Sequence, residues 1–397
     1  MNRFFLVILL FSMFYFADAQ QSVNKEIATI DVEPLTKTSV KPIKYIKTKA
    51  GIEVEFEDES NAFPKIISVN RPDVAEKINL MLQISYLSQV PGKYKDNDPY
   101  YYSDNNGECG RTVFLGYSII TVANKILKVE LNSERTNCTG VGSANENKLD
   151  YFDLTTGNKI VFDDLFNKDH LAALKAGVIN SFKQQLDNYE KDIKDKLKTS
   201  SEENDQEIFH GQLELYSQCK KYTSIGNFNN YVFKVLDGEI KIARNECWSN
   251  EFERGIDEYA SPTFILKLSD YTSKLSAYGK YILGYSEVYA PPQILESKIL
   301  RGLIADKYPI TAVIKRINSD GSLDMYYWYN KVGIPIELHG KLINGVLTLV
   351  ENDYHSETEK RWIPKANISA KVTNTKIEGF WENYKTKEKL KFTIEVN

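Results

Sequence analysis

Short apolar runs and polar turns alternate through roughly the last hundred residues, with one run about every ten residues. This pattern restricts the possible folds of the chain more than any other. The turns include Ser-Asp-Gly at residues 319–321 and Asn-Gly at residues 344–345. Since no stretch here has helical periodicity, we expect an all-β module over residues 300–397, a small antiparallel barrel or sandwich of about seven or eight strands. The expected strands are residues 310–317, 322–329, 334–339, 346–351, 368–372, 376–381 and 390–396.

Three tryptophans lie in this all-β module: Trp328, Trp362 and Trp381. Tryptophan rings on an exposed sheet face can stack on the flat faces of sugars, which would make a glycan-binding surface. In so small a barrel, however, tryptophan also fills the core. The sequence leaves both interpretations open.

A β-hairpin that leads into a long helix is predicted upstream of this module. Residues 151–154 and 159–162 are short apolar runs separated by Thr-Thr-Gly-Asn, where we expect Gly157 and Asn158 to adopt positive φ. Apolar side chains then recur at helical spacing for about 27 residues, which predicts a helix that lies across the sheet and frays at residues 200–205. These side chains are Leu171, Leu174, Val178, Phe182, Leu186, Tyr189, Ile193 and Leu197.

The rest of residues 45–290 predicts an α+β domain, in which one long and one short helix pack on an antiparallel sheet. The short helix begins at Pro72, because apolar side chains recur at helical spacing after it and proline is tolerated in a first turn. Asp-Gly at residues 237–238 is a hairpin turn. Two prolines interrupt the pattern at residues 291–292, so we place a domain boundary near residue 290. The other expected strands are residues 51–57, 64–67, 112–120, 125–131, 230–236, 239–242 and 263–268.

The N-terminus has the three parts of a secretory signal peptide over residues 1–19. Arg3 precedes an apolar run, and Ala-Asp-Ala follows this run as the cleavage site. The run is short for a bilayer, so we expect a protein that is periplasmic or secreted and spans no membrane after cleavage. Residues 20–44 are polar and contain two prolines, which predicts a flexible leader.

The four cysteines are expected to form disulfides, because an exported chain meets an oxidising compartment. Of the three possible pairings we favour Cys109 with Cys138 and Cys219 with Cys247, since each pair brackets one strand-rich segment. Two alternatives stay open. One is free buried thiols, and the other is a zinc site, although no Cys-x-x-Cys is present and the histidines lie apart from the cysteines.

Charge and motifs limit the possible functions. The net charge is −4, whereas nucleic-acid binding calls for a basic face, so we expect no nucleic-acid partner. The motifs of serine hydrolases, zinc proteases and nucleotide-binding proteins are absent, so we expect neither enzymatic activity nor a cofactor or metal. Asp163 and Asp164 are adjacent, and in a strand their carboxylates would point to opposite faces. A catalytic pair assembled from residues far apart in the sequence stays open.

Residues 153–154 (Asp-Leu), 156–157 (Thr-Gly) and 164–166 (Asp-Leu-Phe) carry a resemblance to a known family. The hairpin and helix around them resemble the domain of unknown function in the extracytoplasmic half of the lysozyme-sensing anti-sigma factor RsiV. A related segment is found in peptidoglycan deacetylases of the PdaC type. The resemblance covers residues 45–285 and implies an exported domain that recognises a partner. The C-terminal part resembles a β-module of secreted bacterial proteins, which implies no particular chemistry.

Two departures from the family pattern limit what this resemblance implies. The family has Gly-Gly-x-His before the hairpin, whereas residues 140–144 read Gly-Val-Gly-Ser-Ala, without histidine. The aromatic-proline segment tied to partner contact has no clear counterpart at residues 247–252. The resemblance therefore assigns no lysozyme-binding residues. The transmembrane and sigma-binding parts of RsiV have no counterpart either, so we expect no anti-sigma activity.

Tyr100, Tyr101 and Tyr102 are the candidate binding residues. They lie in the loop-like segment 91–110, where tyrosines would offer a large contact area at a small entropic cost. They would equally cover an edge of the core. We therefore expect a non-enzymatic cell-envelope protein that binds a protein partner, such as a lysozyme, or an envelope glycan. The alternatives are a polysaccharide-binding protein or hydrolase, and a structural envelope protein without a ligand.

Overall fold

The computed structural model describes most of the chain. Tyr100, Tyr101, Tyr102, Cys109 and Cys138 lie outside the described residues, as do residues 1–19, where a signal peptide is predicted. The expectations for these positions therefore stay predictions. The described residues are 26–35, 44–48, 51–55, 62–93, 110–137, 143–244, 246–248, 251–292, 294–318, 320–356, 361–373 and 375–396.

The first sheet has six strands, and every neighbouring pair in it is antiparallel. The longest strands, β5 and β6, are joined by a tight turn in which Ala123 and Asn124 have positive φ. The strands, in spatial order, are β2 (Lys44–Lys47), β3 (Gly51–Glu55), β5 (Gly110–Val122), β6 (Ile126–Asn137), β7 (Ser143–Asp153) and β8 (Lys159–Ile160).

The turn between β7 and β8 is held by a buried carboxylate. Asp153 accepts hydrogen bonds from the backbone N–H of Thr155 at 2.7 Å and from the hydroxyl of Thr156 at 2.9 Å. Gly157 has a φ of 77°, and a Cβ there would collide with the Val74 carbonyl. Asn158 does not adopt positive φ, so this part of the hairpin prediction is wrong. The motif that carried the family resemblance thus builds a turn.

Helix α1 (Pro72–Tyr86) shares a hydrophobic core with the first sheet. Its Val74, Ile78 and Leu82 are buried with Tyr117 of β5 and Val129 of β6. Beside this helix, β1 (Asp31–Pro34) pairs with β4 (Pro64–Ile67). Part of the segment expected to be a flexible leader is therefore a strand, and it buries Val32 partly against this core.

Two long helices follow the hairpin. Helix α2 (Lys168–Thr199) has the predicted apolar stripe, but the chain does not fray after it. Instead it turns back and forms α3 (Glu203–Tyr222), which the sequence analysis did not identify. Leu186 and Ile193 of α2 pack against Leu215 and Tyr216 of α3, so each helix buries its apolar face on the other.

A second, three-stranded sheet consists of β9 (Val232–Leu236), β10 (Glu239–Ala243) and β11 (Thr263–Lys267), in the order β11-β10-β9. Gly238 has a φ of 70°, which confirms the predicted hairpin turn. This sheet shares a core with α2 and with the aromatic side chains that follow β8. The short helices nearby are η2 (Phe162–Leu165), η3 (Ile225–Asn230), α4 (Glu251–Ile256), α5 (Leu268–Tyr271), η4 (Thr272–Lys274) and α6 (Ala277–Ile282).

The C-terminal strands form a closed eight-stranded antiparallel barrel, which confirms the barrel alternative and not the sandwich. Closure depends on the first strand, because it pairs with both the second and the last. This first strand was not among those predicted from the sequence. The strands are β12 (Ile299–Ile304), β13 (Tyr308–Ile317), β14 (Ser322–Tyr329), β15 (Ile336–Ile343), β16 (Val346–Ser356), β17 (Arg361–Val372), β18 (Lys376–Asn383) and β19 (Lys389–Glu395).

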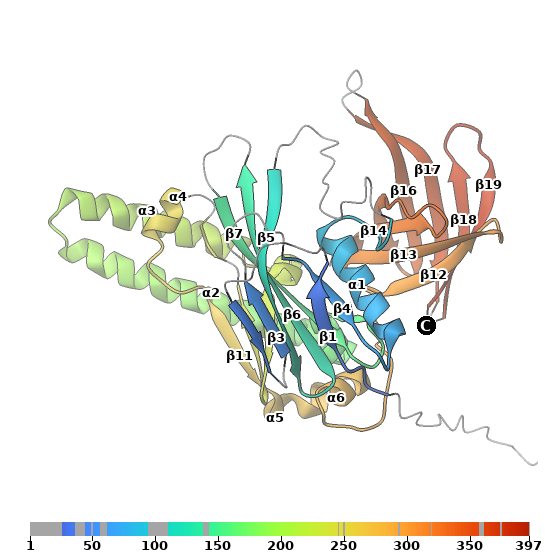
Figure 1. Cartoon of the computed structure of the whole chain (residues 1–397). Coiled ribbons are helices and arrows are strands. Elements are labelled where there is room, and N and C mark those ends of the chain that lie inside the picture. Colours follow the sequence, from blue (N-terminus) through green and yellow to red (C-terminus); the bar gives the residue numbers. More distant parts are fainter. Residues whose placement is uncertain are drawn as a thin grey trace, which may run out of the picture.

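The barrel packs against α1 on one side of the first sheet, and the α2–α3 hairpin extends away on the other side (Figure 1). Val313 of β13 and Trp328 of β14 belong to the same buried cluster as α1. Lys298, which precedes β12, also reaches back to the helix η2. No helix in the described part of the chain has the length and apolar character needed to cross a membrane.

Candidate functional site

A cavity of about 500 Å³ lies where α1, the first sheet, η3 and the barrel meet. Each of these elements contributes part of the wall. Tyr86 comes from the end of α1, Tyr151 from β7, Phe228 from η3, Phe233 from β9 and Tyr326 from β14. The volume falls within the range of small-molecule sites in proteins.

One wall of this junction cavity is aromatic. The rings of Tyr151 and Phe233 stack with their centroids 5.3 Å apart. The ring centroids of Phe162 and Phe228 are 5.2 Å apart. The phenolic oxygen of Tyr151 accepts the backbone N–H of Val235 at 2.9 Å, so this ring also joins the first sheet to the second. Burial raises the pKa of Tyr151 to about 12.

The carboxylates on the first-sheet side of the cavity are held by lysines. Asp150 lies 2.6 Å from Lys159 Nζ and accepts the hydroxyl hydrogen of Tyr86 at 2.9 Å. Burial and the negative charge of Asp150 raise the pKa of Tyr86 well above its usual value. Asp163 lies 2.7 Å from Lys175. These pairs leave little negative charge on this wall.

Asp163 and Asp164 lie in the helix η2 and not in a strand, so the strand argument made for them was wrong. They nevertheless have separate partners. Asp163 faces the cavity, whereas Asp164 is buried and lies 2.7 Å from Lys298 Nζ. Asp164 also accepts the backbone N–H of Val161 at 3.0 Å, although burial raises its pKa.

Glu296 is a further carboxyl group in the cavity wall. Burial raises its pKa, the nearby Asp163 raises it further, and a hydrogen bond from the backbone N–H of Ile317 at 2.9 Å lowers it. A cavity carboxyl with a raised pKa is able to hold a proton and to donate it to a ligand. Sequence reasoning missed Glu296, because no motif surrounds it.

Two adjacent cations, Lys315 and Arg316, occupy the barrel side of the cavity. Lys315 Nζ lies 5.5 Å from the centre of the Tyr326 ring. Arg316 lies 3.7 Å from Asp324, whose other oxygen lies 2.8 Å from His339 Nδ1. The cavity therefore combines an aromatic wall with a basic corner.

A second hollow of about 370 Å³ adjoins the cavity, and Asn229, Asn230 and Arg316 line both. Its wall is rich in amides. Asn227 donates its side-chain N–H to the Tyr222 carbonyl at 2.7 Å, and Asn229 donates to the Ile317 carbonyl at 3.1 Å. Since a carbonyl only accepts, both amide oxygens are left as acceptors for another group. This amide hollow suits a ligand with many hydroxyl or N–H donors.

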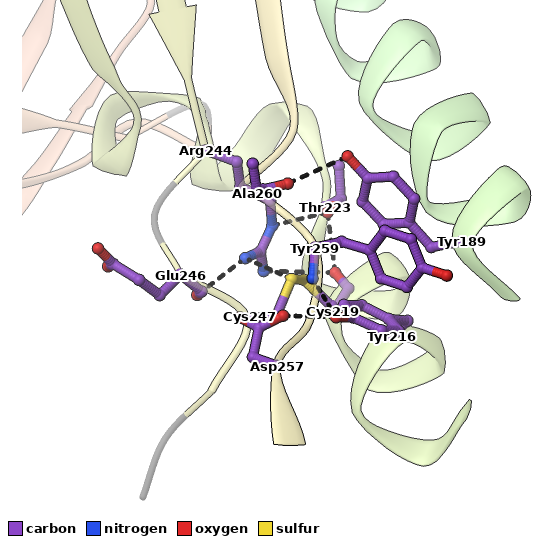
Figure 2. The surroundings of a disulfide bond; sticks show 10 residues. All are labelled: Tyr189, Tyr216, Cys219, Thr223, Arg244, Glu246, Cys247, Asp257, Tyr259 and Ala260. Atoms are coloured by element: carbon purple, nitrogen blue, oxygen red, sulfur yellow. Dashed lines mark hydrogen bonds between the residues drawn. A yellow bond between two sulfur atoms is a disulfide. The ribbon is translucent and has the colours of Figure 1, made fainter. Parts of the chain in front are cut away.

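The disulfide between Cys219 and Cys247 fixes the segment that carries these asparagines. It joins the end of α3 to the chain after β10, with the Cα atoms 5.2 Å apart, and so confirms the predicted pairing. Arg244 donates to the Thr223 hydroxyl at 2.9 Å and to the Cys219 carbonyl at 3.3 Å, as Figure 2 shows. Thr223 begins the connection to η3, so the disulfide anchors one wall of the amide hollow.

The tryptophans do not form a common face. Trp328 and Trp381 are buried, and the indole N–H of Trp381 donates to Glu351 inside the barrel at 2.9 Å. Only Trp362 is exposed, at 51%. The core interpretation is therefore correct for two of the three. Tyr100, Tyr101 and Tyr102 lie outside the described residues, so the structure neither places them at the cavity nor elsewhere.

Within the described ranges, no three His, Cys, Asp or Glu side chains gather in a way that could hold a metal ion. The chain was also compared with known proteins. No protein-family model, no curated protein and no solved structure matches it.

Proposed function

We propose that this chain is an exported binding protein, and that its ligand is a hydroxyl-rich saccharide held in the junction cavity and the adjoining amide hollow. The observation that carries this proposal is the continuity of the two hollows through Asn229, Asn230 and Arg316. The partly exposed rings of Tyr326 and Phe233 thus lie beside a row of amide acceptors for the hydroxyl groups of a sugar.

The amides support a saccharide more than an apolar ligand. Asn227 and Asn229 have their nitrogens engaged by main-chain carbonyls and offer oxygens. The Ser322 hydroxyl donates to Asp320, so it accepts the side-chain N–H of Asn318 at 2.8 Å. The side-chain oxygen of Asn318 is therefore also left as an acceptor. An apolar ligand would bury these oxygens without partners, at a cost of about 1–3 kcal/mol for each.

Calorimetric titration of the mature protein with neutral chitooligosaccharides tests this proposal. Asn230 makes no side-chain hydrogen bond to another described residue, so its amide is available to the ligand. Asn230→Ala is expected to weaken binding by about tenfold. Asn132→Ala, on the exposed side of β6, is the matched control and should leave binding unchanged. Equal affinity of the two variants would contradict the assignment of the site.

Hydrolysis of the saccharide is the second candidate function, and Glu296 is the observation that favours it. Its pKa is raised by burial, as a proton donor to a glycosidic oxygen requires. The test is incubation of peptidoglycan with the protein and with Glu296→Gln. Release of soluble fragments that stops in the variant would replace the non-enzymatic proposal.

Recognition of a protein partner remains the proposal that rests on Tyr100, Tyr101 and Tyr102. Capture of a lysozyme by the protein, lost when all three become alanine at an unchanged melting temperature, would support it. Capture of peptidoglycan alone would favour the saccharide.

The scaffold proposed for this function keeps the predicted boundary near residue 290, between the part that contains the two sheets and the C-terminal barrel. Limited proteolysis tests the division, since few contacts cross an exposed linker. Cleavage near residue 290 should precede cleavage within either part, and the two fragments should stay associated through the contact of Val313 and Trp328 with α1.

A further inference from the structure

We infer that the ligand of the junction cavity is an anionic saccharide, whose acidic group binds at Lys315 and Arg316. This inference rests on the proposed saccharide site and adds the charge of the ligand. It starts from a local irregularity in the barrel, where the pairing of β13 with β14 shifts between Ile314 and Arg316.

The irregularity is a β-bulge at Lys315. Ile314 pairs with Met325 and Arg316 pairs with Asp324, so Lys315 has no partner in the ladder. In a regular strand, consecutive side chains point to opposite faces, and one of the two cations would point into the barrel. The extra residue changes the alternation, so that both side chains line the cavity on the outer face.

The cations elsewhere around the cavity are already paired with carboxylates. Lys159 binds Asp150 at 2.6 Å and Lys175 binds Asp163 at 2.7 Å. Among the described residues, by contrast, Lys315 has no carboxylate within ion-pair distance; its Nζ lies over Tyr326.

Arg316 is only partly neutralised. Its ion-pair contact with Asp324 is long at 3.7 Å, and Asp324 also binds His339 at 2.8 Å. The Nε atom of Arg316 is buried and has no hydrogen-bond partner in the described part of the chain. The side chain as a whole is 44% exposed, so an oxyanion can reach the outer part of its guanidinium group, which binds carboxylate and phosphate in a planar geometry.

The adjoining amides determine which chemical groups the rest of the ligand carries. The oxygens of Asn227 and Asn229 repel an anion but accept hydroxyl hydrogens. A ligand that fits both surfaces therefore carries hydroxyl groups along the amide hollow and one acidic group at the bulge. Uronic acids and phosphorylated sugars share this chemistry.

The test compares three probes on the mature protein by calorimetry: an oligogalacturonate, a phosphorylated mannose oligosaccharide and a neutral chitooligosaccharide. An acidic probe should bind about tenfold more tightly than the neutral one, and added salt should remove this advantage. Preference between the two acidic probes identifies the source of the oxyanion.

Lys315→Gln is the informative variant, because this side chain is exposed and its loss leaves the barrel core intact. It should lower the affinity for the acidic probe by about tenfold and lower the affinity for the neutral probe much less. Lys371→Gln, an exposed lysine on β17, is the matched control and should change neither. Equal binding of acidic and neutral probes to the native protein would overturn the inference while the saccharide proposal stands. Binding of no probe would overturn both.

Discussion

The side-chain nitrogen of Lys298 lies 2.7 Å from Asp164, and the two side chains are 7% and 0% exposed. Lys298 also donates to the Lys159 carbonyl at 2.7 Å. The residue just before the barrel is thereby joined to strand β8 and to the helix η2 that follows it. This ion pair therefore helps to hold the barrel in place relative to the first sheet, and its contribution to the unfolding free energy can be measured.

Lys298→Met is expected to destabilise the protein by about 3–5 kcal/mol in urea unfolding, because it leaves the buried Asp164 carboxylate without its cation. Burial already raises the pKa of Asp164, and the loss of Lys298 should raise it further, so mild acid should protonate the carboxyl and shrink this penalty. Lys376→Met breaks an exposed pair with Glu378 and should cost less than about 1 kcal/mol. A penalty that does not depend on pH would contradict this account.

Tyr151→Phe should destabilise the protein by about 1–3 kcal/mol near neutral pH, since the buried N–H of Val235 loses its acceptor. At alkaline pH the difference between the two proteins should narrow. The pKa of Tyr151 is raised from 10.0 to about 12, so the stability associated with its neutral form is complete below pH 10 and is lost as the pH rises toward 12. That loss is about 3 kcal/mol and is absent in the variant. Urea unfolding of both proteins at several pH values between about 8 and 11 measures the difference in stability and its dependence on pH.

Replacement of both Cys219 and Cys247 by serine should lower the unfolding free energy by roughly 3–4 kcal/mol in the chain-entropy model. The same change should weaken saccharide binding, because the disulfide anchors the chain that leads into η3. Chemical denaturation and calorimetry of the double variant give the two values. Full affinity together with the stability loss would show that η3 keeps its place without the crosslink.

Glu351 is a buried acceptor inside the barrel, where the hydroxyl of Tyr327 and the indole N–H of Trp381 donate to it at 2.7 and 2.9 Å. Its second oxygen lies 2.7 Å from Lys365. In Glu351→Gln, an amide NH2 group replaces one of the two acceptor oxygens and faces another donor. We therefore expect the unfolding free energy to fall by about 2 kcal/mol in thermal or urea unfolding. Glu382→Gln changes only an exposed pair with Lys389 and serves as the comparison. Equal stability of the two variants would rule out a stabilising role for this network.

The sequence was sufficient for the local elements of the barrel but not for its closure. Turns such as Asn344-Gly345 and the apolar alternation of β14 are local signals, and they placed seven of the strands. Strand β12 reads Ile-Leu-Arg-Gly-Leu-Ile, which lacks strict alternation, and its pairing with β19 joins residues far apart, such as Arg301 with Glu395. Barrel and sandwich therefore could not be distinguished in advance.

Helix α3 was missed for a different reason. The polar residues after α2 resemble a frayed helix end, yet only residues 200–202 lie outside the two helices. Leu215 and Tyr216 stabilise the second helix by packing on α2, and this contact between the two helices has no signal in the local sequence.

The candidate site was even less accessible from sequence. Its walls come from separate segments, and a bulge changes the direction in which Lys315 or Arg316 points. No local pattern encodes either fact. The tyrosines chosen from the sequence were conspicuous because they are adjacent, whereas Tyr86, Tyr151 and Tyr326 converge only in three dimensions.

The distance along the chain between the walls of the cavity has a consequence for resistance to proteolysis. Met81 and Tyr326 line the same space, so the cavity exists only after the first sheet and the barrel have both folded and docked. A ligand there binds only the fully folded and docked structure. At a concentration a hundredfold above its Kd, it would stabilise that structure by about 2.7 kcal/mol relative to every partly unfolded form. Proteases attack opened forms, so the lifetime of the protein among them would be set by the supply of its ligand.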